Sequence, residues 1–360
     1  MKVYYDYQIL RLQSYGGISR YYYDLFSTIK NGNLAEVRIR CYYSLNEYFG
    51  ELFGKINKPP KTRLRAYCHT RINRFIVYWE MKRKYDIVHP TYYDPYILKL
   101  KGNSKLVITV YDMIHELFPE LLNDYKLIEE KKTMLYAADG IIAISENTKR
   151  DILKYYPDIN PQKIKVIYLA SNFNPQKHSD CTDANLGGKY ILFVGNRGLY
   201  KNFLRFVKSV MPILDEDEEL YIVCAGGPSF TGDEIKSLGK YYNRFKKIQA
   251  DNDTLYMAYN NAMCFVFPSL YEGFGIPVLE AFACDCPVLL SNTSSFPEVG
   301  GDAAIYFDPR NEGEMREKIK AVLNDADLRK KLKSLGRKQL EKFSWQNIAE
   351  QTISYYESLI

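Results

Sequence analysis

The sequence predicts two α/β domains, each built on a parallel β-sheet whose strands are joined by helices. At 360 residues the chain is longer than a single hydrophobic core usually serves. Short apolar runs typical of buried strands alternate with amphipathic runs typical of helices. A polar stretch without periodicity at residues 173–188 interrupts this alternation and is predicted to be a linker. We therefore expect an N-terminal domain at residues 1–172 and a C-terminal domain at residues 189–344.

The N-terminal half contains the first series of alternating segments. Strands are predicted at residues 2–7, 37–43, 87–89, 106–111, 140–144 and 165–167. Helices are predicted at residues 18–30, 70–84, 124–138 and 146–155. Because helices connect successive strands, the strands of this sheet are expected to run parallel.

The second series begins after the predicted linker. Its strands are predicted at residues 190–195, 219–225, 247–249, 262–267, 287–291 and 304–307. A last helix is predicted at residues 345–360, with Ser344 as its N-cap. Two such Rossmann-like halves bind ligands at the carboxyl ends of their strands, so we expect a cleft between the two carboxyl edges.

Composition and termini narrow the class of protein. A hydrophobic fraction of 46% and a charged fraction of 26% are ordinary for a globular enzyme. The sequence has neither a signal-peptide pattern at its start nor a run of about 18 apolar residues. We expect a cytoplasmic protein, either soluble or peripheral on the inner face of the plasma membrane. The seven cysteines lack the spacing of a zinc site or a disulfide framework, so we expect reduced thiols.

Positive charge is concentrated at residues 55–85. This segment has ten Lys or Arg residues and Glu80 as its single acidic residue before Tyr85, interleaved with aromatic and aliphatic side chains. One interpretation is a solvated helix face, and another is docking on an anionic membrane surface. Nucleic-acid binding is disfavoured because no nucleic-acid motif accompanies the patch.

The most informative motif is Glu272-Gly-Phe-Gly-Ile-Pro-Val-Leu-Glu280, which follows a predicted buried strand. Pro277 suits the first turn of a helix, which places Glu280 about one turn further in. A carboxylate there can accept hydrogen bonds from a ribose diol, while the amides of Phe274 and Gly275 favour an anion. Two glutamates in such positions also occur as solvated or capping residues, but the neighbouring motifs favour a sugar-nucleotide site.

Two other strand-to-helix turns carry residues suited to phosphate. Gly16 and Gly17 follow the first predicted strand and open a helix, where a glycine backbone can approach a ligand closely, although such a pair is also common in simple turns. Arg197 and Lys201 follow the strand at residues 190–195, and we expect both to be exposed. Their charges could grip a diphosphate and neutralise it as it leaves, and solvated loop cations are the alternative.

Polar residues also follow strands in the N-terminal half. Asp112 and His115 come after the strand at residues 106–111, and His89 ends the strand at residues 87–89. Two possible ligands without a third make a poor metal site, so no metal is predicted. Asp112 could cap the turn, His115 could lie at the surface, and His89 could be a hydrogen-bonded core residue; all three remain candidates for a site at the carboxyl edge.

Taken together, these motifs resemble the retaining glycosyltransferases of family 4. The resemblance covers nearly the whole chain and rests on Gly16-Gly17, Tyr111-Asp-Met-Ile-His115, Ala143-Ile-Ser-Glu-Asn-Thr148, Val194-Gly-Asn-Arg197 with Lys201-Asn202, and Pro268 to Glu280. It implies the GT-B architecture: two Rossmann-like domains with parallel sheets facing across a central cleft. It also implies that the helix at residues 345–360 completes the N-terminal domain.

The resemblance implies a role for each candidate residue. Glu280 would hold the ribose, Arg197 and Lys201 the donor diphosphate, and Glu272 with the Phe274 and Gly275 amides the donor sugar. Gly16 and Gly17 would face the phosphates and the acceptor, and Asp112 would contact the sugar or orient the acceptor. Many members have His where this chain has Tyr111, so His115 and His89 are weaker candidates. Members of this family need no divalent metal or other cofactor.

The resulting functional prediction is transfer of a hexose from a UDP- or GDP-hexose to an acceptor hydroxyl. The acceptor is predicted to be a glycan or lipid-linked intermediate of O-antigen, capsule or other surface-polysaccharide assembly. The alternatives are a non-catalytic sugar-nucleotide-binding subunit of a polysaccharide assembly and a GT-B epimerase or phosphorylase. Nucleic acid is not a predicted partner.

Overall fold

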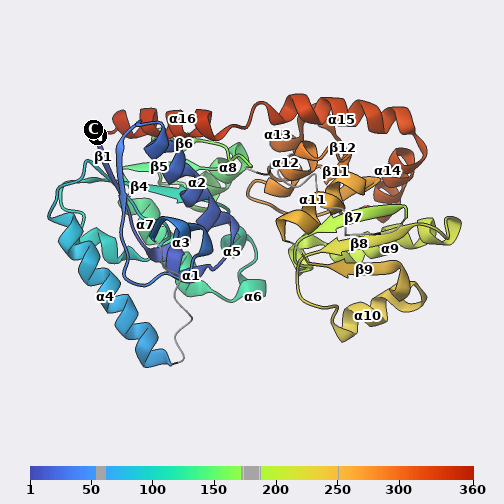
Figure 1. The fold of residues 1–360 in the computed structure, drawn as a ribbon, viewed down its shortest axis with the longest axis horizontal. Helices are drawn as coiled ribbons and strands as arrows, with labels where there is room; N and C mark the ends of the chain where they lie inside the picture. Colours follow the sequence, from blue (N-terminus) through green and yellow to red (C-terminus); the bar gives the residue numbers. More distant parts are fainter. Residues whose placement is uncertain (54–61, 172, 174–185, 187, 250) are drawn as a thin grey trace. The chain divides into compact units, whose positions relative to one another are not determined.

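The computed structural model describes residues 1–53, 62–171, 173, 186, 188–249 and 251–360. The chain divides into two compact units (Figure 1). Unit 1 comprises Met1–Leu169 together with Ser344–Ile360, and unit 2 comprises Ala170–Phe343. Most of the predicted linker at residues 173–188, and positions 55–61 of the basic segment, lie outside the described residues.

Unit 1 is built on a six-stranded parallel sheet in the order β2-β1-β3-β4-β5-β6. Its strands are β1 (Lys2–Tyr5), β2 (Glu36–Ile39), β3 (Ile87–His89), β4 (Lys105–Val110), β5 (Gly140–Ala143) and β6 (Ile164–Val166). In β3, β4 and β5 almost every side chain is buried, as expected where helices cover both faces of a parallel sheet.

The helices of unit 1 connect these strands and supply its outer layers. They are α1 (Gln8–Leu12), α2 (Gly17–Asn31), α3 (Glu47–Phe53), α4 (Arg63–Met81), α5 (Ile114–Leu117), α6 (Pro119–Leu122), α7 (Tyr125–Ala137), α8 (Glu146–Tyr155) and α16 (Trp345–Glu357), with 3-10 turns η1 (Pro95–Lys99) and η2 (Pro161–Lys163). The last helix, α16, packs against α2, and its Tyr355 hydroxyl donates to the carbonyl of Lys163 at 2.5 Å (Figure 1). The end of the chain thereby belongs to the first structural unit.

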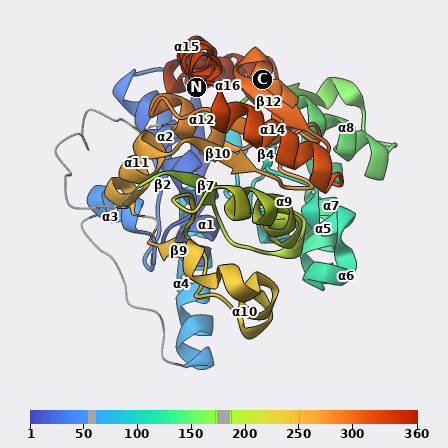
Figure 2. The same cartoon turned by 90° about the vertical axis from the view of Figure 1, so that its right-hand side faces the viewer.

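Helix α4 is longer than predicted from its hydrophobic pattern. It begins at Arg63 rather than near residue 70, because the Thr62 side chain caps it by accepting a hydrogen bond from the Arg65 amide at 3.3 Å. Figures 1 and 2 show the N-terminal end of α4 projecting from the rest of unit 1. Its exposed side chains therefore have little contact with the core.

Unit 2 has a second six-stranded parallel sheet in the order β12-β11-β10-β7-β8-β9. Its strands are β7 (Tyr190–Val194), β8 (Tyr221–Ala225), β9 (Phe245–Ile248), β10 (Cys264–Phe267), β11 (Val288–Ser291) and β12 (Ala304–Phe307). The order places β7 and β10 side by side, although 73 positions separate Ile191 from its partner Cys264. Loops that follow these two strands must meet at one edge of the sheet.

Helices on both faces bury the core of unit 2. They are α9 (Phe203–Glu216), α10 (Gly232–Leu238), α11 (Asn252–Asn261), α12 (Ile276–Ala283), α13 (Phe296–Gly300), α14 (Glu312–Asn324) and α15 (Ala326–Leu340), with 3-10 turns η4 (Leu199–Lys201), η5 (Gly239–Arg244) and η6 (Gly301–Ala303). The two parallel-sheet units confirm the predicted α/β fold class. Within the described ranges, no helix has both the length and the apolar composition needed to cross a membrane.

Candidate functional site

The candidate donor site lies at the carboxyl edge of the unit 2 sheet, where the loops after β7 and β10 meet. The Leu270 amide donates to the carbonyl of Tyr200 at 2.7 Å, which joins the two loops directly. Asn202 adds a second link, because its side-chain amide donates to the carbonyl of Pro268 at 3.0 Å. Asn202 has the left-handed backbone conformation (φ 61°), which Asn tolerates better than most residues. These bonds fix the turn that carries Lys201.

Lys201 and Glu272 form an ion pair across these loops. Lys201 Nζ lies 2.6 Å from Glu272 Oε1, and the side chains are only 14% and 12% exposed, so the prediction that Lys201 would be exposed is wrong. The ammonium also lies 5.0 Å from the centroid of the Phe267 ring. An ammonium group has three donors, so the pair can hold Lys201 in place while other N–H groups contact an anion. The structure thus brings together two residues that the sequence predicted separately.

The loop that carries Glu272 is anchored by two serines after β11. Ser294 Oγ accepts a hydrogen bond from the Glu272 amide at 3.1 Å, and the single O–H of Ser295 is shared between the carbonyls of Glu272, at 2.9 Å, and Phe274, at 2.8 Å. Gly275, with φ of 111°, is the N-cap of α12. Only glycine adopts this backbone conformation readily. The residues at this helix start are therefore held rigidly.

Glu280 lies further along α12, as the spacing of the motif predicted. The buried Tyr259 hydroxyl donates to Glu280 Oε2 at 3.2 Å. Burial, followed by the charge of Glu280, raises the pKa of Tyr259 well above its usual value, so this phenol remains a donor at neutral pH. The carboxylate is thereby oriented from α11, a contact that the motif itself does not reveal.

Arg197 is not exposed, and the prediction that it would be is wrong. Its side chain is 2% exposed, and its Nε lies 2.7 Å from Glu234 Oε1 on α10. Its Nη2 donates to the carbonyl oxygens of Pro228 at 2.6 Å and Ser229 at 3.2 Å. Burial raises the pKa of Glu234, but the hydrogen bonds from Arg197 and Thr231 more than offset this and hold it below the ordinary value.

The remaining terminal nitrogen of Arg197 is Nη1. Nη1 is buried and has no hydrogen-bond partner among the residues that the structure describes. A Cβ added to Gly227 would lie 3.2 Å from this atom, so glycine at this position leaves room beside it. Arg197 therefore supports the loop after β8 and can contact a ligand with a single nitrogen at most, unless it leaves Glu234.

Gly16 and Gly17 lie at the start of α2 in unit 1, as predicted. Gly16 is the N-cap and has an extended backbone, and Gly17 is exposed. The side-chain oxygen of Gln13 accepts a hydrogen bond from the Ser19 amide at 3.1 Å. Gln13 therefore occupies part of this helix start, and a phosphate would have to displace its side chain.

Asp112 and His115 lie on the loop and short helix after β4. Asp112 Oδ1 accepts a hydrogen bond from the Ile114 amide at 3.0 Å and is half-buried, which is the geometry of a turn-capping residue. Lys131, fully buried on α7, donates to the carbonyl of Asp112 at 3.1 Å and to Glu116 at 2.8 Å. His115 is half-buried on α5. A buried ion pair thus fixes the loop that carries both candidates.

His89 is a core residue, which removes it from the candidates for substrate contact. It is fully buried, and its Nδ1 lies 2.5 Å from the Tyr356 hydroxyl of α16. Its Nε2 lies 3.0 Å from Thr109 Oγ1. Burial lowers the pKa of His89 to about 3, so its imidazole is neutral and links the last helix to the sheet.

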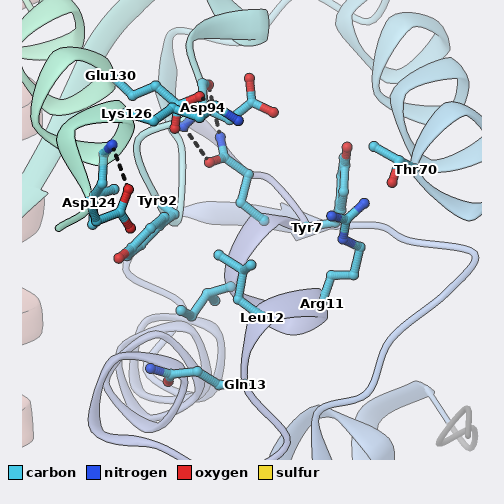
Figure 3. A pocket seen from close by; sticks show the side chains of 13 residues that line it. Tyr7, Arg11, Leu12, Gln13, Thr70, Tyr92, Asp94, Asp124, Lys126 and Glu130 are labelled. Carbon is cyan, nitrogen blue, oxygen red and sulfur yellow. Dashed lines mark hydrogen bonds and ion pairs between the residues drawn. The ribbon is translucent and has the colours of Figure 1, made fainter. Parts of the chain in front are cut away.

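A pocket at the carboxyl edge of the unit 1 sheet was not predicted. It has a volume of about 460 Å³ and follows the ends of β1 and β3. Figure 3 shows Tyr7, Arg11 and Thr70 on one side of it, and Tyr92 and Lys126 on the other. Residues 6–13 carry no glycine or recognisable motif, so the sequence signal was only their position after the first strand.

A polar network includes Gln8 and Asp94, two of the residues that line this pocket. Asp6 is fully buried and accepts hydrogen bonds from Thr91 Oγ1 at 2.9 Å and from the Gln8 side chain at 2.7 Å. Gln8 in turn accepts one from the Asp94 amide at 2.7 Å. Arg11 Nη1 is buried, with no hydrogen-bond partner in the described part of the chain. The pocket thus offers one unsatisfied cationic donor beside neutral and acidic acceptors.

Two family models together match most of the sequence. The model described as "Glycosyltransferase Family 4" matches residues 15–171, and the model described as "Glycosyl transferases group 1" matches residues 176–339. Apart from its last two residues, the first match lies in unit 1, and the second lies in unit 2.

No group of three or more His, Cys, Asp or Glu side chains that could hold a metal ion occurs among the described residues.

Known proteins resemble the chain over much of its length. O-antigen chain mannosyltransferase B of Escherichia coli is 27% identical over 299 residues, which are 78% of this chain and 77% of that protein. The N-acetylgalactosamine-N,N'-diacetylbacillosaminyl-diphospho-undecaprenol 4-alpha-N-acetylgalactosaminyltransferase of Campylobacter jejuni is 28% identical over 246 residues, 66% of this chain and 64% of that protein.

The fold also matches a solved structure. The HepE protein of Anabaena, determined in complex with UDP-glucose, superposes with a TM-score of 0.75 at 15% sequence identity, and the match covers all of both chains. At this identity the likeness concerns the fold, which is GT-B. The two family models, the related mannosyltransferase and the shared fold agree with the motifs at the two carboxyl edges, and the chain belongs to the group 1 glycosyltransferases of family 4.

Proposed function

We propose that this protein is a retaining, metal-independent hexosyltransferase that uses a UDP- or GDP-hexose and a lipid-linked or polymeric glycan acceptor. The observation that carries the proposal is the Lys201–Glu272 pair, which lies on the same edge of the unit 2 sheet as the start of α12 and Glu280. A cation, helix-start amides and a ribose-binding carboxylate on one edge match the chemical parts of a nucleoside diphosphate sugar.

The proposed donor contacts follow from this arrangement. Lys201 binds the diphosphate with the N–H groups that Glu272 leaves available, and Arg197 contributes through Nη1. The amides of Phe274 and Gly275, with Glu272, address the hexose, and Glu280 accepts hydrogen bonds from the ribose hydroxyls. The donor named in the solved complex of HepE, UDP-glucose, supports a ligand of this class.

The proposed chemistry is transfer within one ternary complex. The bond between the anomeric carbon and the diphosphate oxygen breaks, and the bond between that carbon and the acceptor oxygen forms on the same face. The acceptor's proton passes to the departing phosphate oxygen, and a nucleoside diphosphate leaves. Lys201 stabilises the negative charge that develops on the diphosphate, which is the kind of contribution that accelerates a transfer most.

The acceptor is proposed to bind in unit 1. Its pocket of about 460 Å³ falls in the range of pockets that hold small molecules. Carboxylates and tyrosines there suit the hydroxyl groups and ring faces of a sugar. Gly16 and Gly17, Asp112 and His115 remain proposed contributors on the same side of the unit 1 sheet. The O-antigen and diphospho-undecaprenol-linked substrates in the names of two relatives support a surface-polysaccharide acceptor.

Peripheral membrane association is proposed for α4. Leu64 is 71% exposed and lies between Arg63 and Arg65, and Trp79 is 52% exposed with Lys82 Nζ 3.8 Å from its ring centroid. Apolar side chains among cations suit the interface of an anionic bilayer. Co-sedimentation with vesicles tests this: binding to vesicles that contain phosphatidylglycerol should exceed binding to phosphatidylcholine vesicles, and equal binding would contradict it.

Donor turnover tests the enzymatic proposal. The purified protein would be incubated with UDP- and GDP-hexoses, with and without EDTA and an isoprenoid diphosphate-linked sugar, while nucleotide release is measured. We expect nucleotide release from one donor. The acceptor should accelerate this release, and EDTA should leave its rate unchanged. The glycoside product should keep the donor's anomeric configuration. An inverted product would contradict retention, phosphate-dependent cleavage would indicate a phosphorylase, and binding without release would indicate a non-catalytic subunit.

A further inference from the structure

A wide groove runs along α4 in unit 1, opposite the turn η1. It has a volume of about 1280 Å³. From α4 it is lined by Ile72, Phe75 and Tyr78, and from the other side by Leu98 and Leu100. Phe75 is 61% exposed and Tyr78 is 46% exposed. Large apolar side chains gathered in an open groove indicate a surface that an apolar ligand covers.

The rim of this groove is positively charged. Arg71 and Arg74 from α4 and Lys99 from η1 line it together with a single acidic residue, Asp94. The first acidic residue of α4 is Glu80. It is buried and lies near Arg38, Arg40 and Arg83. The apolar groove is therefore flanked by cations, which is complementary to an anionic amphiphile.

The groove adjoins the polar pocket at the carboxyl edge of the same unit. Thr70 and Asp94 line both spaces. At this junction Arg74 Nη2 lies 2.6 Å from Asp94 Oδ2, and the two side chains are 45% and 34% exposed. On the pocket side, Arg11 carries the buried Nη1 without a hydrogen-bond partner among the described residues. The apolar groove, the junction with Arg74 and the polar pocket are thus neighbours.

We propose that the groove and the pocket together bind one acceptor molecule: a lipid whose phosphate or diphosphate links an apolar chain to a sugar. This inference rests on the proposed glycosyl transfer and deepens it. The apolar chain lies in the groove against Phe75, the phosphate lies at the junction near Arg74 and Arg11, and the sugar occupies the pocket. Arg74 exchanges part of its contact with Asp94 for the phosphate, which is a strong charge-assisted acceptor.

The order of the compartments argues against simpler occupants. A free oligosaccharide would leave the apolar groove exposed, and an uncharged lipid would not satisfy the cations at the junction. A phosphate-linked lipid satisfies both and delivers its sugar to the carboxyl edge of the sheet. Chain length should therefore affect acceptor affinity strongly.

The test compares acceptors and variants in dilute detergent, where vesicle binding plays no part. One acceptor carries a sugar on a long isoprenoid diphosphate, and the other carries the same sugar on a diphosphate with a short alkyl group. We expect the long chain to lower KM, and Phe75→Ser to raise KM for the long-chain acceptor by about tenfold or more while leaving the short-chain KM unchanged. Tyr136→Ser is the matched control, because Tyr136 is an exposed aromatic of α7 that lines neither the groove nor the pocket. Equal KM values for both acceptors, or equal effects of the two variants, would overturn the proposal.

A binding measurement separates this inference from the enzymatic proposal. Farnesyl phosphate, farnesol and inorganic phosphate would be titrated into the wild-type protein below their aggregation limits. We expect farnesyl phosphate to bind most tightly, and Arg74→Gln to remove its advantage over farnesol. If farnesyl phosphate binds in this way but no donor is turned over, the groove assignment stands and the transfer is wrong. If it binds no better than farnesol to the wild-type protein, the groove assignment is wrong whatever the activity.

Discussion

Lys201 Nζ lies 2.6 Å from Glu272 Oε1, although 71 positions separate the two residues in the chain. The contact exists because β7 and β10 are neighbours in a parallel sheet, so the loops after them reach the same edge. Both side chains are largely buried, which strengthens the interaction relative to a surface pair. In the proposed donor complex, Glu272 would orient the cation that is proposed to bind the diphosphate.

Replacing Lys201 should reduce turnover sharply. Lys201→Ala removes the cation proposed to neutralise the leaving diphosphate, so kcat should fall by a factor on the order of 100 or more. Lys208→Ala is the matched control, because Lys208 is 67% exposed and its ion pair with Glu312 is long, at 3.9 Å. Steady-state kinetics of both variants decide the matter. Comparable rates for the two would remove Lys201 from the reaction.

Replacing Glu280 should weaken nucleotide binding rather than folding. Glu280→Ala removes a charged acceptor for the ribose hydroxyls, which costs about 1–3 kcal/mol of binding free energy. Glu317→Ala, at an exposed position of α14, provides the control. Titration calorimetry with the preferred nucleoside diphosphate would measure the difference. An unchanged Kd in Glu280→Ala would contradict the assignment of Glu280 to the ribose.

Replacing Arg197 should reduce stability, in contrast to the exposed position that its sequence context suggested. Arg197→Met leaves Glu234 without its buried partner, and we expect the free energy of unfolding to fall by about 3 kcal/mol. Arg337→Met breaks an ion pair with Asp285 in which the arginine is 66% exposed, and should cost less than about 1 kcal/mol. Urea unfolding measures both. Loss of turnover at full stability would instead show that Arg197 acts mainly on substrate.

The buried His89 should make stability fall as the pH is lowered. Its pKa is about 3 in the folded protein, against about 6.5 in the unfolded chain. Between these values the unfolded chain binds a proton that the folded protein does not, so acidification favours unfolding. From pH 7.5 to 5 this group should cost about 2 kcal/mol. His89→Gln should show a correspondingly shallower dependence in urea unfolding, and identical pH dependences would contradict the burial of a neutral imidazole.

The sequence was sufficient for the strands and for the family. Each predicted strand lies within a few residues of an observed one, because continuous Val-, Ile- and Tyr-rich runs have few alternatives to a buried parallel strand. The ends of the helices were predicted less well. The start of α4 depends on the Thr62 cap, and the hydrophobic pattern that predicted the helix begins only where Asn73 and Val77 face the core.

The candidate site was predicted in its parts but not in its connections. The motif from Glu272 to Glu280 located one loop, yet its hydrogen bonds with Tyr259, Ser294 and Ser295 depend on strand order, which one sequence does not reveal. The burial of Arg197 was not predictable from its sequence context. A cation after a strand has the same sequence signal whether it faces solvent or a buried carboxylate, and Glu234 is 37 residues away.

Calorimetric titration of the purified protein with UDP, GDP, ADP and CMP, with and without EDTA, is the most direct test of a nucleotide-sugar site in unit 2. We expect one nucleoside diphosphate to bind with a Kd on the order of micromolar, and EDTA to leave this Kd unchanged. We also expect much weaker binding to Glu280→Ala. The absence of binding to all four nucleotides would contradict a nucleotide-sugar site at the carboxyl edge of unit 2.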